Sequence, residues 1–185
     1  FAAIDNVIAI KVAPFNRYRT LDVVRGVVAA EAEDRISLYT GNDDHIFLDL
    51  LTPFTVRRDD ETVVVRFRGG LLGHWSVWVK PAVDYLARAH AAVAAGMGDM
   101  ELLRLDSQIT DANGALFDVV NDFAGCIAGC HEVLRRQGLL RGTWCLNPEE
   151  AMSPGQAEAL DRVMADYPHL CDDAFVAENL ERWLA

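Results

Sequence analysis

The first 95 residues alternate between short apolar runs and amphipathic stretches. Residues 7–12, Val-Ile-Ala-Ile-Lys-Val, are nearly all apolar and rich in β-branched side chains, which is typical of a buried parallel strand. Two further strands are expected over residues 36–40 and 69–73. Helices are expected over residues 20–32, 44–51 and 76–95. This alternation predicts an α/β fold with a parallel sheet and helices outside it.

An insertion and a helical tail complete the pattern. Residues 54–57 and 62–67 are β-type runs separated by a charged segment, so we expect an inserted β-hairpin near 54–67. After residue 95 the apolar positions recur at helical spacing only. Helices are expected over 100–109, 114–137 and 173–184, and another begins near Ser153-Pro154-Gly155-Gln156. We therefore predict one region over residues 1–95 and a helical region over 96–185 packed on it.

Composition excludes several classes of function. The net charge of −11 argues against a nucleic-acid groove, because phosphates attract clustered Lys and Arg side chains. No apolar stretch reaches the roughly 18–20 residues that span a bilayer, which indicates a protein without a membrane partner. The cysteines are Cys126, Cys130, Cys145 and Cys171. This spacing differs from that of a secreted disulfide scaffold, so we expect reduced thiols and a cytoplasmic location.

Lys11 is the first candidate for chemistry, because reactive groups in parallel α/β folds gather at the carboxyl ends of the strands. It follows four apolar residues of the first strand. Burial would favour the neutral amine, which attacks carbonyl carbon and forms a Schiff base. The strand pattern is equally consistent with a lysine that extends from the strand end into water.

Polar residues follow the second and third strands. Asn42, Asp43, Asp44 and His45 could clamp a substrate hydroxyl or carbonyl, or bind a metal together with His74. They are also ordinary residues for a turn and a helix N-cap. Cys126, Cys130 and His131 share one helix, but they lack a second ligand pair, which favours buried thiols.

Three segments, in their order and spacing, resemble one enzyme family. Residues 7–11 are similar to the sixth barrel strand of the dihydrodipicolinate synthase and N-acetylneuraminate lyase family, which ends in the Schiff-base lysine. Residues 38–43, Leu-Tyr-Thr-Gly-Asn-Asp, resemble its seventh strand, and residues 69–73, Gly-Gly-Leu-Leu-Gly, its eighth. The tail, including residues 138–141, resembles the C-terminal helices of the family.

The resemblance implies a fold and an activity. The fold would be the C-terminal part, strands six to eight and the following helices, of a (β/α)8 TIM barrel with a helical extension. Lys11 would condense with a pyruvate-like 2-oxo acid, giving an enamine that adds to an aldehyde or a sugar-derived acid, or would catalyse the reverse cleavage. This class I chemistry requires no cofactor and no metal. The substrate-binding residues would be Tyr39, Gly41, Asn42, Asp43, Gly73 and His74.

The resemblance also implies partners. A complete barrel takes about 250 residues, and three βα units do not close one. We therefore expect the chain to complete its barrel with missing residues or with another chain, which would supply the general acid or base, and to form a homo-oligomer. Two other functions remain open: a non-catalytic ligand-binding protein of the same fold, and a metal-dependent aldolase using Asp43, Asp44, His45 and His74.

Overall fold

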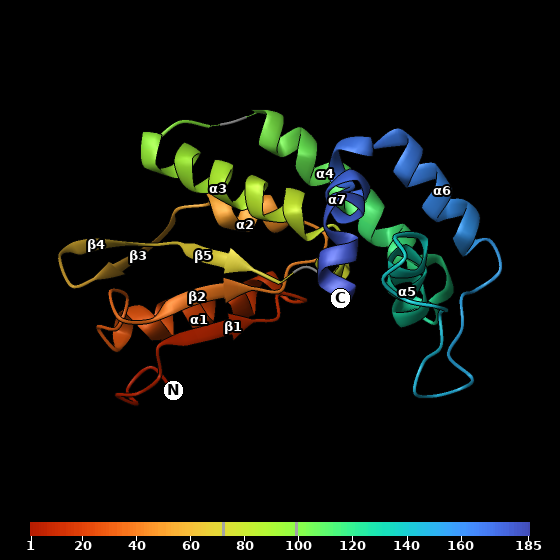
Figure 1. Cartoon of the computed structure of the whole chain (residues 1–185). Coiled ribbons are helices and arrows are strands. Elements are labelled where there is room, and N and C mark those ends of the chain that lie inside the picture. Colours follow the sequence, from red (N-terminus) through yellow and green to blue (C-terminus); the bar gives the residue numbers. More distant parts are fainter. Residues whose placement is uncertain (72, 99) are drawn as a thin grey trace. The chain divides into compact units, whose positions relative to one another are not determined.

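The computed structural model describes residues 1–71, 73–98 and 100–185 of the chain (Figure 1). The strands are β1 (Ala9–Val12), β2 (Ser37–Thr40), β3 (Phe54–Arg58), β4 (Glu61–Val65) and β5 (Phe67–Gly70). The α-helices are α1 (Arg17–Ala29), α2 (Ile46–Leu51), α3 (Val79–Ala95), α4 (Met100–Leu116), α5 (Cys126–Arg136), α6 (Gln156–Asp166) and α7 (Asp173–Leu184). Short 3-10 helices are η1 (Gly73–Ser76), η2 (Val119–Asn121) and η3 (Pro168–Leu170).

The chain forms two compact units that interleave along the sequence. Unit 1 comprises Phe1–Leu72 and Arg88–Asp106, and unit 2 comprises Gly73–Ala87 and Ser107–Ala185. Unit 1 holds all the strands of the described residues, whereas unit 2 is helical. None of the described helices combines the length and apolar character that a membrane crossing requires.

The strands of unit 1 form two small sheets. A parallel sheet has the order β1-β2-β5, and β3 pairs with β4 as an antiparallel hairpin. The hairpin expected near residues 54–67 is thus present, but Phe67 belongs to the next strand, β5. Leu72, which was expected in the third parallel strand, lies outside the described residues, and Gly73 belongs to η1.

The expected fold class is wrong. The described residues form an open three-stranded parallel sheet and a separate two-stranded antiparallel hairpin, and the order of strands six to eight of a TIM barrel does not appear among them. The physical reason is closure: a barrel of this type needs eight tilted strands whose last strand pairs with the first. Here β1 and β5 are instead the two edges of the sheet, so the fold is a small mixed α/β arrangement with a helical second unit.

The two faces of the parallel sheet have opposite surroundings, because side chains alternate between faces along a strand. Val12, Leu38, Thr40 and Phe67 are buried on what we call the covered face. In Figure 1 helix α1 runs behind β1 and β2, and its Val24, Val27 and Val28 are also buried. On the opposite side, which we call the open face, Ala9, Lys11, Ser37 and Tyr39 are exposed.

Capping explains where α1 begins. The helix expected over residues 20–32 begins earlier, because Asn16 is its N-cap: the Asn16 side-chain oxygen accepts hydrogen bonds from the backbone nitrogens of Tyr18 and Arg19 at 3.1 and 3.3 Å. An Asn at this position satisfies amide groups that the first helical turn leaves without partners. Thr20 lies inside the helix and is buried. The earlier start brings Arg17 into the first turn.

The helical stretch expected over residues 114–137 is interrupted in unit 2. Asp118, Asp122 and Phe123 have left-handed backbone conformations, with φ of 57°, 53° and 66°, and these separate the end of α4 from α5. Asp118 is held in this turn by hydrogen bonds that its carboxylate accepts from the Gly125 nitrogen, at 2.9 Å, and from the Ser153 hydroxyl. Long-range contacts therefore override the local helical pattern.

Candidate functional site

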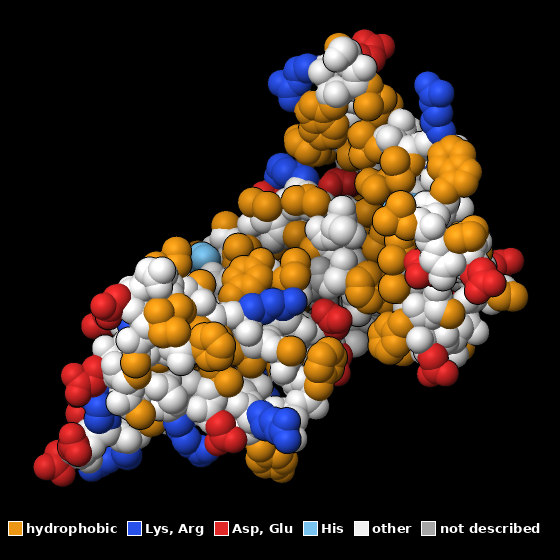
Figure 2. Space-filling view, turned by 90° about the horizontal axis from the view of Figure 1, so that it is seen from below, with side chains coloured by type: hydrophobic (Ala, Val, Ile, Leu, Met, Phe, Trp, Pro, Cys, Tyr) orange, Lys and Arg blue, Asp and Glu red, His pale blue; other side chains and the backbone are white. Residues whose placement is uncertain are grey.

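The open face of the sheet carries the side chains of Lys11 on β1 and Tyr39 on β2, next to a glycine on β5. Lys11 on β1 is paired in register with Tyr39 on β2, and Tyr39 with Gly69 on β5. The Tyr39 ring lies against Gly69, with its Cε2 atom 2.9 Å from the position that a Cβ would occupy there. Apolar side chains reach the molecular surface in patches, interspersed with charged ones, in the view of Figure 2. Lys11 and Tyr39 are both exposed, and their register makes them neighbours near the carboxyl ends of their strands.

Gly41, directly after β2, makes room for the lysine side chain. A Cβ at this position would lie 3.0 Å from Lys11 Cε and 3.7 Å from Lys11 Nζ. The Gly41 nitrogen donates a hydrogen bond to the Val12 carbonyl at 2.9 Å, which fixes the backbone beside the lysine. Any larger residue at position 41 would therefore crowd the amine.

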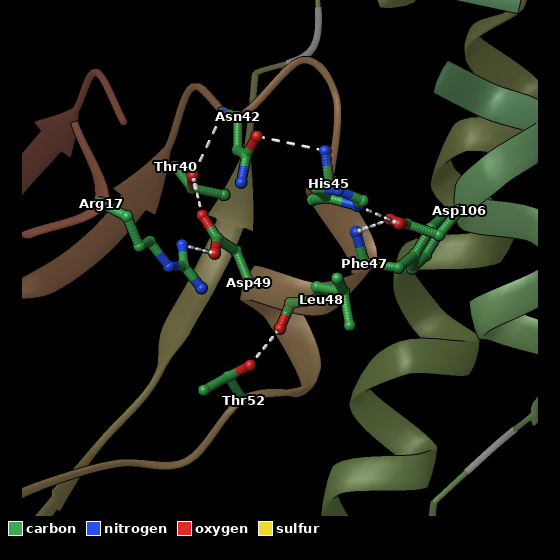
Figure 3. Close-up of polar contacts among 9 residues, drawn as sticks. All are labelled: Arg17, Thr40, Asn42, His45, Phe47, Leu48, Asp49, Thr52 and Asp106. Atoms are coloured by element: carbon green, nitrogen blue, oxygen red, sulfur yellow. Dashed lines mark hydrogen bonds and ion pairs between the residues drawn. The ribbon is translucent and has the colours of Figure 1, made fainter. Parts of the chain in front are cut away.

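A hydrogen-bonded network holds the start of the loop that follows β2 (Figure 3). The Thr40 hydroxyl donates to Asp49 Oδ2 at 2.6 Å and accepts from the Asn42 nitrogen at 3.2 Å. Asn42 Oδ1 in turn accepts from the His45 nitrogen at 3.1 Å. Thr40 and Asn42 are both buried, so the loop carrying Gly41 and Asp43 starts from a fixed position.

A charge pair completes this end of the network. Asp49 on α2 is fully buried, and one of its carboxylate oxygens pairs with the Arg17 guanidinium, which is 44% exposed. Arg17 also lies over the Phe54 ring, 5.3 Å from its centre. A buried carboxylate is tolerated only when it is paired or hydrogen-bonded. The role of Arg17 is therefore to compensate the charge of Asp49, not to bind a ligand at the surface.

The far end of the loop is held by a second carboxylate, from α4. Asp106 Oδ2 lies 2.9 Å from His45 Nδ1, and Asp106 Oδ1 accepts from the Phe47 nitrogen at 2.9 Å. Figure 3 shows that the side chains of Asp49 and Asp106 approach the loop region from different helices. Together they fix both ends of residues 41–45 beside the row of Lys11 and Tyr39.

Lys11 differs from the other lysine of the sequence, Lys80. In the part of the chain that the structure describes, Lys11 Nζ has no hydrogen bond or ion pair. Lys80 Nζ pairs with the Asp84 carboxylate one helical turn away. An ammonium group engaged with a carboxylate is a poorer nucleophile than one without a partner, so Lys11 is the better candidate.

Gly73 and His74 lie in unit 2. His74 is 1% exposed, and Asn113 Oδ1 lies 3.3 Å from its backbone nitrogen and 3.2 Å from its Nδ1. Burial lowers the pKa of His74 from 6.5 to about 4, although the Asn113 hydrogen bond opposes this change. A Cβ at Gly73 would overlap the Phe117 ring. Both residues thus have clear packing roles.

The polar residues expected to bind a metal are engaged elsewhere. Within residues 1–71, 73–98 and 100–185, no three His, Cys, Asp or Glu side chains are arranged to hold a metal ion. His45 faces Asp106 and His74 faces Asn113. All four cysteines are free thiols, and burial raises the pKa of Cys130.

Sequence reasoning did not find Asp49 or Asp106. Asp49 lies inside the apolar stretch 46–51, and a carboxylate in the middle of such a stretch is a signal of a buried, paired group. Asp106 has no comparable signal, because its role depends on a contact 61 residues away. Comparisons with protein-family models, curated proteins and solved structures gave no match to this chain.

Proposed function

We propose that the chain is a Schiff-base-forming lyase or aldolase in which Lys11 condenses with a pyruvate-like 2-oxo acid. The proposal also retains the resemblance of the strand-end motifs to the dihydrodipicolinate synthase and N-acetylneuraminate lyase family. It rests on one observation above all: Lys11 lies beside Tyr39 on the open face, with Gly41 leaving room for its amine.

The reaction begins at Lys11 Nζ. Its lone pair attacks the C2 carbonyl carbon of the 2-oxo acid, and the carbonyl oxygen leaves as water after gaining two protons. Loss of a proton from C3 gives an enamine, which adds to the carbonyl carbon of an aldehyde, and hydrolysis of the new imine returns the amine. Cleavage is the same sequence reversed.

The neighbouring residues have binding roles in this proposal. Tyr39 offers an exposed ring on the strand beside Lys11, and the loop residue Asp43 would contact substrate hydroxyls, whereas the buried Asn42 holds the loop through its hydrogen bond with His45. The network of Arg17, Asp49 and Asp106 holds that loop and is not in contact with the substrate. Arg17, Asp49 and Asp106 are therefore positioning residues. Their loss should weaken substrate binding more than it lowers the reactivity of the Lys11 amine.

A non-catalytic ligand-binding function is the second candidate, and the exposure of Lys11 favours it. A protonated lysine on an open surface binds a carboxylate by charge alone and forms no covalent bond. The two candidates differ in whether a covalent adduct forms.

Reductive trapping tests the proposal. The intact chain is incubated with pyruvate and borohydride, and the modified residue is located by mass spectrometry of peptides. We expect a reduced pyruvate adduct on Lys11, because hydride converts the imine into a stable secondary amine. Binding of pyruvate without any adduct would support the non-catalytic candidate instead.

Two matched variants control the experiment. Lys11→Arg keeps the positive charge but removes the nucleophile, so the adduct should disappear. Lys80→Arg removes the other lysine of the chain and should leave labelling unchanged. Lactate, which has no carbonyl carbon at C2, should give no adduct with any variant.

A further inference from the structure

A small cavity in unit 1 has no part in the proposed chemistry of Lys11. Its volume is about 220 Å³, which is below the usual range of sites for drug-sized ligands and therefore suits a small molecule. Most of its wall is apolar, with Leu51 at the end of α2, Val93 near the end of α3 and Met97 just beyond that helix. Among the described residues of the wall, only Arg66, between β4 and β5, carries a charge.

The guanidinium group of Arg66 is held at the wall of this cavity. Its Nη1 atom donates a hydrogen bond to the carbonyl oxygen of Leu51, another wall residue, at 2.8 Å. A guanidinium has five N–H donors in one plane, and those of Arg66 have no other acceptor in the part of the chain that the structure describes. Arg66 is half-buried rather than enclosed, so a ligand in the cavity can reach the remaining N–H groups.

Arg66 differs from the other half-buried arginine of the strands, Arg58. The Arg58 side chain is 26% exposed and forms ion pairs with Glu33 and Glu61. Arg66 forms no ion pair with a carboxylate of the described residues. A guanidinium that is partly removed from water without an anion is unfavourable, and its planar donors match the two oxygens of a carboxylate. The absence of a counter-charge at Arg66 therefore indicates an anionic ligand.

The end of α3 opposes such a ligand only weakly. Carbonyl groups at a helix C-terminus carry partial negative charge, but two of them already accept hydrogen bonds here. The Gly96 nitrogen donates to the Val93 carbonyl at 3.1 Å. The Met97 nitrogen donates to the Ala92 carbonyl at 3.2 Å, which closes the helix end. The full positive charge of Arg66 therefore dominates the electrostatics of the wall.

We propose that this cavity binds a small monocarboxylate with an apolar tail. The Arg66 guanidinium donates paired hydrogen bonds to the carboxylate, and Leu51, Val93 and Met97 contact the tail. One guanidinium balances the single charge of a carboxylate, and the apolar wall removes the tail from water. The site is independent of the proposed function of Lys11, because it uses none of the residues on the open face.

Hexanoate and its neutral analogue hexanamide test the site on the intact chain, since the two compounds have nearly the same shape. Binding is followed by the ¹³C-methyl signals of Met97, Met100, Met152 and Met164, and Met97→Leu assigns the signal of Met97. We expect hexanoate to shift the Met97 signal and to bind at least about tenfold more tightly than hexanamide, because hydrogen bonds between charged groups are the stronger ones. Met152 and Met164, which lie in unit 2, should not respond.

Two variants with the same net charge complete the test. Arg66→Gln should bind hexanoate and hexanamide nearly equally. Arg68→Gln removes an exposed arginine outside the cavity wall and should keep the preference for hexanoate. The comparison of acid and amide is made on the natural chain, so the test does not depend on the folding of either variant. Equal binding of the two compounds to the natural chain, no shift of Met97 with hexanoate, or loss of the preference in Arg68→Gln would overturn the proposal.

Discussion

Lys11 and His74 are both polar residues near the ends of apolar strand-like segments, yet their environments are opposite. Lys11 is exposed on the open face of the sheet in unit 1. His74 is almost completely buried in unit 2, where desolvation lowers its pKa to about 4. The sequence pattern around each residue predicts a site, but only the three-dimensional packing decides whether a solute can reach it.

Buried polar residues such as His74 stabilise the fold, whereas exposed ones such as Lys11 are accessible to solutes. Polar groups with buried, satisfied hydrogen bonds contribute to the free energy of unfolding, and their loss leaves partners unsatisfied. An exposed side chain contributes little to stability.

Removing the buried imidazole should be the most destabilising change. We expect His74→Ala to lower the free energy of unfolding by about 3 kcal/mol, because it leaves a cavity and removes the partner of Asn113. Lys11→Ala should change it by less than about 0.5 kcal/mol. Urea denaturation of both variants measures the difference, and similar losses for the two would contradict the division.

The same imidazole should make stability depend on pH. His74 has a folded pKa of about 4 and an ordinary value of 6.5, so the unfolded chain binds the proton more readily. Its contribution is therefore complete above pH 6.5 and is lost as the pH falls toward 4. Between pH 8 and pH 5 the loss should be about 2 kcal/mol.

The control for this pH dependence is a variant without the titrating group. His74→Gln should be less stable at pH 8 but should lose less stability on acidification than the natural chain. The comparison uses urea denaturation at each pH. Parallel curves for the two proteins would show that His74 is not the group responsible.

Breaking the ion pair beneath the loop should have an intermediate effect. We expect Asp49→Asn to cost about 1.5 kcal/mol, because the buried side chain keeps its shape but loses its charge, while Arg17 can still reach water. Asp22→Asn removes an exposed pair with Arg25 and should cost less than about 0.5 kcal/mol. Thermal or urea unfolding of the two variants tests the contrast.

The hydroxyl of Tyr39 on the open face should matter least to stability. Tyr39→Phe keeps the ring against Gly69 and removes only an exposed hydroxyl, so we expect a change below about 0.5 kcal/mol. The variant should nevertheless weaken pyruvate binding if the hydroxyl contacts the substrate. A large loss of stability would instead assign Tyr39 to the core of unit 1.

Local patterns predicted many elements of this chain. Strand β2 and helix α7 lie where their apolar spacing and turn residues predict them. In both, the packing in the folded chain favours the same conformation as the local sequence. The start of β5 was missed because only Arg66 separates Val65, the end of β4, from Phe67, and no Gly, Pro, Asn or Asp marks a turn there. The interruption after α4 was missed because it depends on the contact between Asp118 and Ser153.

The fold class and the supporting network could not be obtained from local pattern. Strand order within a sheet depends on pairing between distant segments, and three parallel strands are compatible with an open sheet as well as with part of a barrel. Likewise, Asp49 becomes a buried anchor only when α1 brings Arg17 beside it. That Lys11, Tyr39 and Gly41 lie close together could be expected from the sequence, because they lie at or just after the ends of neighbouring strands.

We propose that Lys11 is a selective nucleophile for a 2-oxo acid. The most direct test of this proposal is the ratio of pyruvate labelling at Lys11 and Lys80 within the same protein molecules, measured over time in the presence of borohydride. We predict that Lys11 is labelled at least about tenfold faster than Lys80, because the Lys80 ammonium group is engaged with the Asp84 carboxylate. Equal labelling of the two lysines, or labelling that does not saturate with pyruvate, would contradict it.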